Sequence, residues 1–218
     1  MSAAREEILR RVRRSTRDVP GAERPDDVPV ERGYRKTDDT PRPEIVERFA
    51  ERTAEYKAKV SRVSEADLPG AIRDALEACG VKGLVVPPGL PEAWVPDGVE
   101  VLRDGPGAQL TNDELDRSDG VLTGCALGIA QTGTIVLDAG EAQGRRALTL
   151  LPDYHLCVVR EEQVVGLVPE AFAVLRDTVV GERRAVTFIS GPSATSDIEL
   201  NRVEGVHGPR TLEVLIVG

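Results

Sequence analysis

Apolar residues recur at the spacing of an amphipathic helix in two stretches of the first half of the chain. These helices are expected over residues 44–59 and 64–79, and short apolar runs at 60–63 and 83–86 flank the second helix. Ser64 can cap the start of the second helix, and Gly80 favours its end. The pattern predicts a strand–helix–strand unit, preceded by a helix whose Ile45, Val46 and Phe49 face inward.

The rest of the chain alternates between apolar runs of strand length and stretches rich in turn residues. Strands are expected within residues 98–102, 119–130, 131–138, 155–160, 163–168, 185–190 and 211–218, and helices over 111–118 and 169–176. Several of these runs are apolar throughout, as in strands that are buried on both faces. The sequence thus predicts an α/β fold with an open mixed sheet flanked by helices.

The N-terminal segment differs from this pattern. Residues 3–17 hold a narrow apolar stripe, Ile8, Leu9 and Val12, among six arginines, and a Pro- and Asp-rich stretch without periodicity follows up to Pro43. We therefore expect a basic helix and linker over residues 1–43 and an α/β domain over 44–218. The basic face is compatible with an acidic partner or a membrane surface, and equally with a solvated helix.

Composition narrows the range of functions. With 28 Lys and Arg against 37 Asp and Glu, the net charge is −9, which argues against general affinity for nucleic acids or anionic membranes. Aromatic residues make up 3% of the chain, too few for a platform that stacks nucleic-acid bases. The N-terminus lacks the apolar region of a signal peptide, and no apolar run approaches the ~20 residues that span a bilayer. A soluble cytoplasmic protein is expected.

The sequence contains no recognisable cofactor or metal motif. Cys79, Cys125 and Cys157 are odd in number and far apart, which fits reduced thiols rather than disulfides or an iron–sulfur or zinc site. No P-loop, no GxGxxG after a strand, no pair of metal ligands and no nucleophile elbow occurs. We therefore expect no bound cofactor and no metal.

Two segments rich in small and hydroxyl residues are candidate ligand sites. The first runs through Gln131, Thr132, Gly133 and Thr134, between two expected strands. Gly133 permits close approach of a ligand to the backbone, and the threonine hydroxyls with nearby N–H groups suit a phosphate or carboxylate. A tight hairpin without a ligand explains the same residues.

The second segment follows the strand expected at 185–190. It contains Gly191, Ser193, Thr195, Asp197 and Glu199 and is expected to enter a short helix. Open α/β sheets bind ligands where a strand ends in such a turn, because the helix N-terminus offers unpaired donors. Ordinary helix capping by a hydroxyl, with Asp197 and Glu199 in the first turn, is the alternative.

A third candidate is the glycine-rich turn with His207, Gly208 and Arg210. His207 has the chemistry of an acid or base, and Arg210 or Arg145 can clamp a carboxylate, although a lone histidine in a turn is more often structural. Arg145 stands beside Arg146 in a separate glycine turn. His155 is expected as a core or strand-end residue. We predict that the candidate loops converge on one anion-binding pocket.

Three stretches in this order resemble the LUD domain family, most closely its lactate utilisation protein C branch. They are GIAQTGTIVL at 128–137, GRRALTLLPDYHLCVV at 144–159 and ISGPSATSDIELNRVEGVHGPRTLEVLIV at 189–217. The resemblance implies a fold similar to the sugar-phosphate isomerase and CoA-transferase-like group. It also implies a role in oxidising L-lactate to pyruvate with iron–sulfur partner proteins, which agrees with the lack of cluster ligands in this chain.

One residue departs from the family pattern. Where the family commonly has a glutamate in the sequence Ala-Glu-Thr-Gly-Thr, this chain has Gln131. A glutamine is neither a proton acceptor nor an acyl nucleophile, so carboxylate catalysis at this loop is not expected.

Three functions remain open at this point. The first is a subunit of a lactate-oxidising assembly that binds a small anionic metabolite. The second is a free-standing isomerase or acyl/CoA-transfer enzyme, which lacks an obvious acid–base pair once Gln131 is considered. The third is a pure interaction module. The sequence specifies neither a catalytic residue nor the oligomeric state, and a homo-oligomer is compatible with it.

Overall fold

The computed structural model describes residues 3–24, 27, 31, 33–192, 194–195, 203–204 and 208–218. The chain divides into two compact units, Met1–Tyr34 and Arg35–Gly218. The first unit contains the predicted basic helix, α1 (Ala3–Ser15), which has no buried residue. Its Ile8 and Val12 side chains are exposed. The hydrophobic core lies in the second unit.

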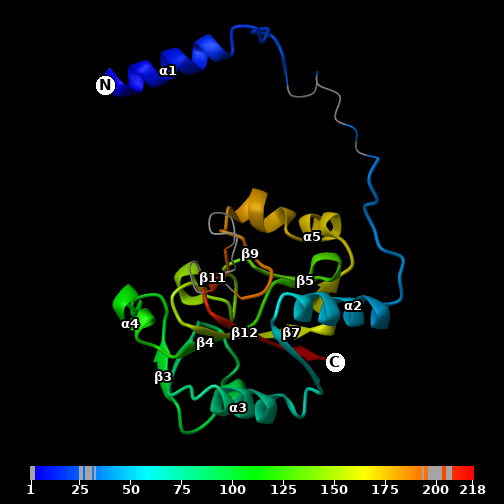
Figure 1. The fold of residues 1–218 in the computed structure, drawn as a ribbon, viewed down its shortest axis with the longest axis vertical. Coiled ribbons are helices and arrows are strands. Elements are labelled where there is room, and N and C mark those ends of the chain that lie inside the picture. The colour runs from blue at the N-terminus through cyan, green and yellow to red at the C-terminus, as the bar shows by residue number, and fades with distance from the viewer. Residues whose placement is uncertain are drawn as a thin grey trace. The chain divides into compact units, whose positions relative to one another are not determined.

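Six parallel strands form the main sheet in the described part of the chain (Figure 1). They are β1 (Lys59–Val63), β2 (Gly83–Val86), β3 (Glu100–Arg103), β4 (Gly120–Thr123), β7 (Tyr154–Arg160) and β12 (Thr211–Val217), in the order β1-β12-β7-β4-β2-β3. The central strands β7 and β12 are buried along almost their whole length. This agrees with their uninterrupted apolar sequences.

A smaller sheet lies beside the main one and holds the antiparallel pairs. Its order is β8 (Val164–Val165), β5 (Leu127–Ile129), β6 (Thr134–Leu137) and β9 (Thr187–Ile189). The β5–β6 and β6–β9 pairs are antiparallel, and β5–β8 is parallel. The predicted α/β class with flanking helices is therefore confirmed, with the mixed strands gathered in this separate sheet. A short antiparallel pair, β10 (Ala194–Thr195) with β11 (Val203–Glu204), follows β9.

Helices cover both faces of the main sheet. The α-helices of the second unit are α2 (Arg42–Glu55), α3 (Leu68–Ala78), α4 (Asn112–Asp116) and α5 (Val168–Val174). Single turns lie at η2 (Glu92–Trp94), η3 (Ala130–Thr132), η4 (Arg146–Thr149) and η5 (Glu161–Gln163), with a π-helical turn at η6 (Asp177–Glu182). No helix in the described ranges has the length and apolar character needed to cross a bilayer.

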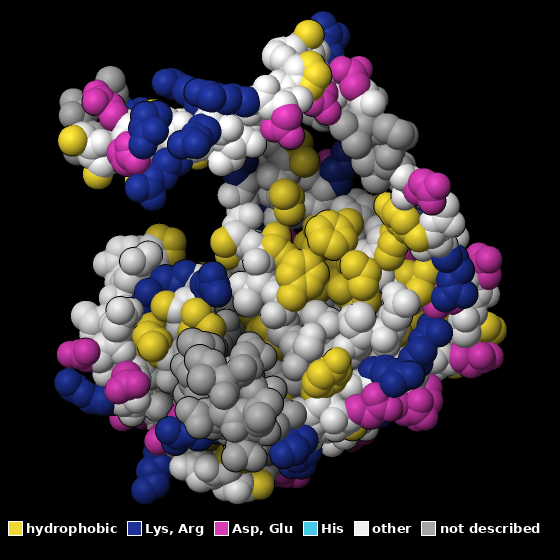
Figure 2. All heavy atoms as spheres, turned by 45° about the horizontal axis from the view of Figure 1, so that its top comes forward, with side chains coloured by type: hydrophobic (Ala, Val, Ile, Leu, Met, Phe, Trp, Pro, Cys, Tyr) yellow, Lys and Arg dark blue, Asp and Glu magenta, His cyan; other side chains and the backbone are white. Residues whose placement is uncertain are grey.

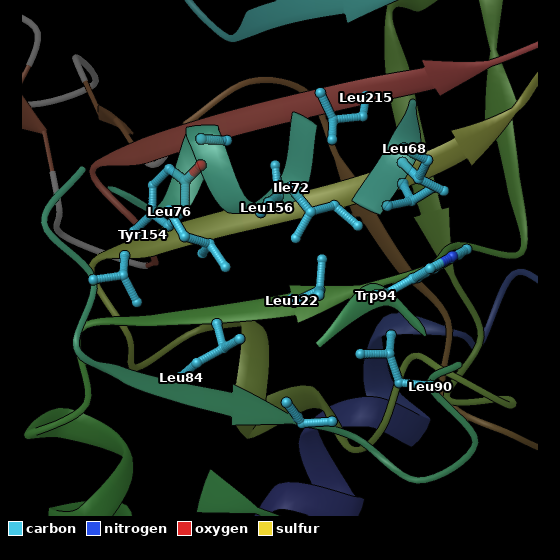
Figure 3. Packing of buried hydrophobic residues seen from close by; sticks show 14 of the residues in the cluster. Leu68, Ile72, Leu76, Leu84, Leu90, Trp94, Leu122, Tyr154, Leu156 and Leu215 are labelled. Carbon is cyan, nitrogen blue, oxygen red and sulfur yellow. The ribbon is translucent and has the colours of Figure 1, made fainter. Parts of the chain in front are cut away.

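The two faces of the main sheet have separate cores. On one face, Ile72 and Leu76 of α3 point toward Leu156 and Leu215 (Figure 3). On the other face, Phe49 of α2 belongs to a cluster with alternate residues of the same two strands, Cys157 and Val214 among them. Burial of each large apolar side chain contributes about 1.5–3 kcal/mol, so these clusters fix the layers that position the site.

Polar contacts define the ends of several elements. Thr111 and Glu114 form a capping box at the start of α4, where the sequence predicts a helix. The carboxylate of Asp119 accepts hydrogen bonds from the backbone N–H groups of Lys82 and Gly83, which holds the turn before β4 against the start of β2. The Asp119 contacts thus hold the starts of the neighbouring strands β2 and β4 next to each other.

Candidate functional site

A cavity of about 290 Å³ lies where the smaller sheet meets the start of two central strands. Its polar lining includes Arg146, Thr149, His155 and Ser190, and Gly191 and Gly208 complete that side. Phe188, Ile189 and Leu212 contribute apolar surface. We call this cavity the His155 pocket.

The pocket lies toward the amino ends of the central parallel strands. His155 is the second residue of β7 and stands opposite Leu212, the second residue of β12. Open α/β sheets more commonly bind ligands at the carboxyl ends of their strands. Here β9 and the turn after it supply one wall of a partly open cavity, and residues near the start of β7 and β12 line it as well.

His155 is the most enclosed polar side chain of the pocket, with 1% of its surface exposed. Its Nε2 atom lies 2.8 Å from the hydroxyl oxygen of Thr123, which is fully buried. Because a hydroxyl can either donate or accept, this contact fixes the orientation of the ring in either tautomer. The sequence indicated a core or strand-end role for His155, and the structure gives it a place in the pocket lining as well.

Two buried thiols lie behind the pocket. Cys157 follows His155 on the same face of β7, and its Sγ atom lies 3.6 Å from the carbonyl oxygen of Gly124. A hydrogen bond with Cys125 lowers the pKa of the Cys157 thiol, and contacts with His155 and Thr123 lower it further. The same thiol–thiol bond, together with burial, raises the pKa of Cys125. Cys157 is therefore the more acidic thiol of the pair.

The sequence did not indicate this thiol pair, because Cys125 and Cys157 are 32 positions apart and follow no motif spacing. The alternation of His155 and Cys157 along one strand was the available signal, since residues two apart share a face. Among the described residues, no three His, Cys, Asp or Glu side chains gather in a way that could hold a metal ion.

The first two candidate segments meet through their hydroxyl groups. Thr134 Oγ1 lies 2.7 Å from Ser190 Oγ and 2.8 Å from Thr132 Oγ1. Ser190 and Gly191 line the His155 pocket, whereas Thr132 and Thr134 do not. The Thr134 hydroxyl thus holds Ser190, a residue of the pocket wall, although neither threonine lines the pocket itself.

Gly133 approaches protein backbone closely. Its φ angle is +56°, and a Cβ atom added to it would lie 2.5 Å from the carbonyl carbon of Arg52. The close approach permitted by this glycine is therefore to α2. The segment forms the hairpin between β5 and β6, which was the alternative explanation of its sequence. Gln131 is exposed, and its backbone N–H donates to the carbonyl oxygen of Gly166 at 3.0 Å.

The remaining candidate residues are distributed over several places. Gly208 lines the His155 pocket beside Gly191. Arg210 is exposed and pairs with Asp153 at 3.0 Å, away from that pocket. Thr195 lies in β10, paired with Val203. Ser193, Asp197, Glu199 and His207 lie outside the described residues.

The two neighbouring arginines contact different cavities. Arg146 lines the His155 pocket, whereas Arg145 is bound to Asp104 in another cavity. Arg145 and Arg210 thus line different cavities, and neither lines the His155 pocket. Arg146 supplies a cationic group in the pocket that the sequence did not assign to it.

An exposed apolar surface adjoins the pocket through Phe188. Its ring stacks on that of Phe172, with centroids 5.9 Å apart. Phe172, Val179, Val180 and Phe188 have between 45% and 71% of their surface exposed. Figure 2 shows apolar side chains gathered on the face that carries α5. We call the stacked pair of Phe172 and Phe188 the Phe172 patch.

Comparison with known proteins defines the family. The LUD domain family model matches residues 46–217. The chain belongs to the LUD domain family. A relative from Deinococcus radiodurans, named lactate utilization protein C, is 52% identical over 177 residues, 81% of each chain. A protein of the same name from Geobacillus kaustophilus is 29% identical over 71% of this chain and 70% of its own.

A solved structure shares the fold of this LUD domain. The crystal structure of a DUF162 family protein from Deinococcus radiodurans superimposes with a TM-score of 0.72 at 46% sequence identity. The match covers 82% of this chain and 99% of that chain. The α/β arrangement that builds the His155 pocket thus belongs to a fold that has been observed experimentally.

Proposed function

We propose that this protein is a subunit of an L-lactate utilisation system and that the His155 pocket binds a small carboxylate. In this system, iron–sulfur partner proteins carry the electrons when L-lactate is oxidised to pyruvate in the cytoplasm. The names of the relatives, lactate utilization protein C, support the pathway. The arrangement of Arg146 and the buried His155 around one cavity supports the ligand class.

The pocket has groups that suit a small carboxylate. The guanidinium of Arg146 supplies positive charge, and the hydroxyls of Thr149 and Ser190 supply hydrogen bonds. A volume of about 290 Å³ suits a small metabolite. The buried imidazole of His155 carries the proposal, because enclosure strengthens its interaction with a bound anion or with a hydroxyl beside the carboxylate.

The Phe172 patch supports the proposed partnership. Large exposed apolar patches on soluble proteins mark interaction sites, and this patch continues into the pocket lining through Phe188. A partner bound there would stand beside the ligand. Copurification of the tagged wild-type protein and of Phe172→Asp from lactate-grown cells tests the partnership. Loss of iron–sulfur proteins from the variant alone is expected, and their absence from both samples would contradict it.

Thermal unfolding with and without ligands tests the pocket. A carboxylate at a hundred times its Kd stabilises the folded state by about 2.7 kcal/mol, which raises Tm by roughly 5–10 °C. We expect this with L-lactate or pyruvate, and a much smaller shift for Arg146→Gln. Arg210→Gln is the matched control, because this arginine lies outside the pocket.

The same screen separates the proposal from its alternatives. Stabilisation by coenzyme A with no response to L-lactate or pyruvate would favour an acyl-transfer enzyme. An equal response to L-lactate in Arg146→Gln and the wild type would place the ligand elsewhere. No response to any small anion would leave a pure interaction module as the remaining function.

A further inference from the structure

A second cavity, of about 390 Å³, lies at the opposite ends of the parallel strands. Gly89 in its wall comes shortly after β2, and Asp104 and Gly105 follow β3 directly. Gly144 and Arg145 come from the loop after β6. We call this cavity the carboxyl-edge pocket.

The sheet order gives this position significance. From β2 the chain continues to β3, which pairs with β2 on the side away from β4. From β4 the next strand of the main sheet along the chain is β7, which pairs with β4 on the side away from β2. The connections after the adjacent strands β2 and β4 therefore lead away in opposite directions. Such a switch point, at the carboxyl ends of the strands, is where open α/β sheets form ligand crevices.

Backbone bonds hold the loop after β6 across this switch point. Ala142 donates its N–H to the carbonyl oxygen of Pro88, after β2, and accepts from Gly124, after β4. Ala139 and Ala142 have φ angles of +56° and +60°, which are uncommon for residues other than glycine. These bonds keep the pocket wall in a fixed conformation.

Arg145 is held by one edge of its guanidinium group. Its Nε and Nη2 atoms donate to the Asp104 carboxylate at 2.9–3.2 Å, and Nη2 also donates to the carbonyl oxygen of Leu110. Asp104 is 5% exposed and also accepts from the backbone N–H of Leu110. Among the described hydrogen bonds none involves Nη1 of Arg145. Nη1 can therefore donate to a ligand from a guanidinium group that Asp104 already holds in one orientation.

We infer that the carboxyl-edge pocket is a second binding site, which takes a small monocarboxylate end-on at Nη1 of Arg145. Nη1 of Arg145 donates the hydrogen bond to the ligand, and Asp104, which compensates the charge of the guanidinium, holds it in position. Glu141, an exposed residue of the same lining, opposes highly charged anions such as phosphate dianions. This site shares no lining residue with the His155 pocket.

Gly105→Leu and Glu141→Gln test the site without breaking the Arg145–Asp104 pair, and Arg145→Gln tests it by removing the pair. A Cβ atom on Gly105 would meet only Pro88 at 3.6 Å, and its φ angle is not in the left-handed region, so Gly105→Leu can fill the pocket without backbone strain. Glu141→Gln removes one opposing charge and should tighten carboxylate binding about twofold to fivefold at low salt. Arg145→Gln should weaken it about tenfold or more, because hydrogen bonds to charged groups are strong.

Calorimetric titration with acetate, L-lactate, pyruvate and inorganic phosphate provides the measurement. It is carried out on the wild type and on Arg146→Gln, which impairs the His155 pocket. We expect carboxylate binding that persists in Arg146→Gln, is lost when Gly105→Leu is added, and is stronger with Glu141→Gln. Phosphate should bind more weakly than acetate.

Other results would overturn this inference or the proposed function, and they are distinguishable. If Arg146→Gln alone removes all binding, the second site is absent while the proposed function stands. If Gly105→Leu leaves the residual binding unchanged, or Glu141→Gln weakens it, the residual site is not the carboxyl-edge pocket. If binding depends on Gly105 and not on Arg146, the second site stands and the His155 pocket is not a carboxylate site.

Discussion

Thr134 Oγ1 lies 2.7 Å from Ser190 Oγ and joins two segments that are 56 positions apart in the chain. Thr134 is buried and has a second hydroxyl partner in Thr132, whereas Ser190 is exposed. The bond therefore fixes the turn after β9 against the β5–β6 hairpin. It connects the pocket wall to the part of the domain that contacts α2.

The asymmetry of this bond predicts different costs for removing its two partners. Thr134→Val should lower the free energy of unfolding by about 1 kcal/mol or more, because it removes the hydrogen bonds of a buried hydroxyl with Thr132 and Ser190. Ser190→Ala should cost less, since Thr134 retains Thr132 as a partner. Urea unfolding of both variants measures this. A larger cost for Ser190→Ala would mean that Ser190 has the more important set of contacts.

Gly133→Ala should be strongly destabilising because the added methyl group meets the α2 backbone. Gly80 provides the matched control, since its φ angle of +67° is similar and nothing lies within 4 Å of an added Cβ atom. Gly80→Ala should cost only the backbone strain of about 1 kcal/mol. Gly133→Ala should cost at least about 2 kcal/mol more, as overpacking does. Equal Tm values for the two variants would contradict the close contact with α2.

Asp119 should make stability depend on pH in the acid range. Hydrogen bonds from the backbone N–H groups of Gly83 and Lys82 lower the pKa of its carboxyl group below the ordinary value of about 3.9. The stabilisation is therefore present above that value and is lost as the pH falls through the lowered pKa. Asp119→Asn should have a flatter stability profile between neutral pH and about pH 3. A profile identical to that of the wild type would show that other carboxylates dominate.

Local sequence patterns were sufficient for the elements of the main sheet. The apolar spacing of Ile72 and Leu76 predicted α3, the stretch 111–118 predicted α4, and uninterrupted apolar runs predicted β7 and β12. These signals depend on residues close together in the chain. The α/β class follows from their order alone.

The site was less predictable because it depends on contacts between distant segments. Nothing near Gly133 in the sequence shows that α2 will pack on it, so the same glycine was compatible with a ligand. Arg145 and Arg146 look equivalent in the sequence, yet they contact different cavities. These contacts join segments that are distant in the chain, such as Arg145 with Asp104, and a local apolar pattern does not encode such pairings.

Removal of residues 1–34 should leave the α/β domain intact, because α1 contributes no buried residue. Removal of residues 1–40 should be more costly, since it takes away the buried Asp38 carboxylate. Hydrogen bonds from Thr40, then the interaction with Arg48, lower the pKa of Asp38. Its backbone N–H also donates to Glu170 at the start of α5. The longer deletion leaves Arg48 without this partner in the structure.

Differential scanning calorimetry of the two truncated proteins measures the difference. We expect the 35–218 protein to unfold within about 2 °C of the full chain and the 41–218 protein at least about 5 °C lower, because the lost hydrogen bonds to a charged group contribute about 1.5–3 kcal/mol each. Asp38→Asn in the full-length protein is the control, and it should reproduce part of the loss. If the two truncated proteins unfold at the same temperature, residues 35–40 are a linker. If the shorter deletion already unfolds the domain, the N-terminal unit stabilises it through contacts other than those of Asp38.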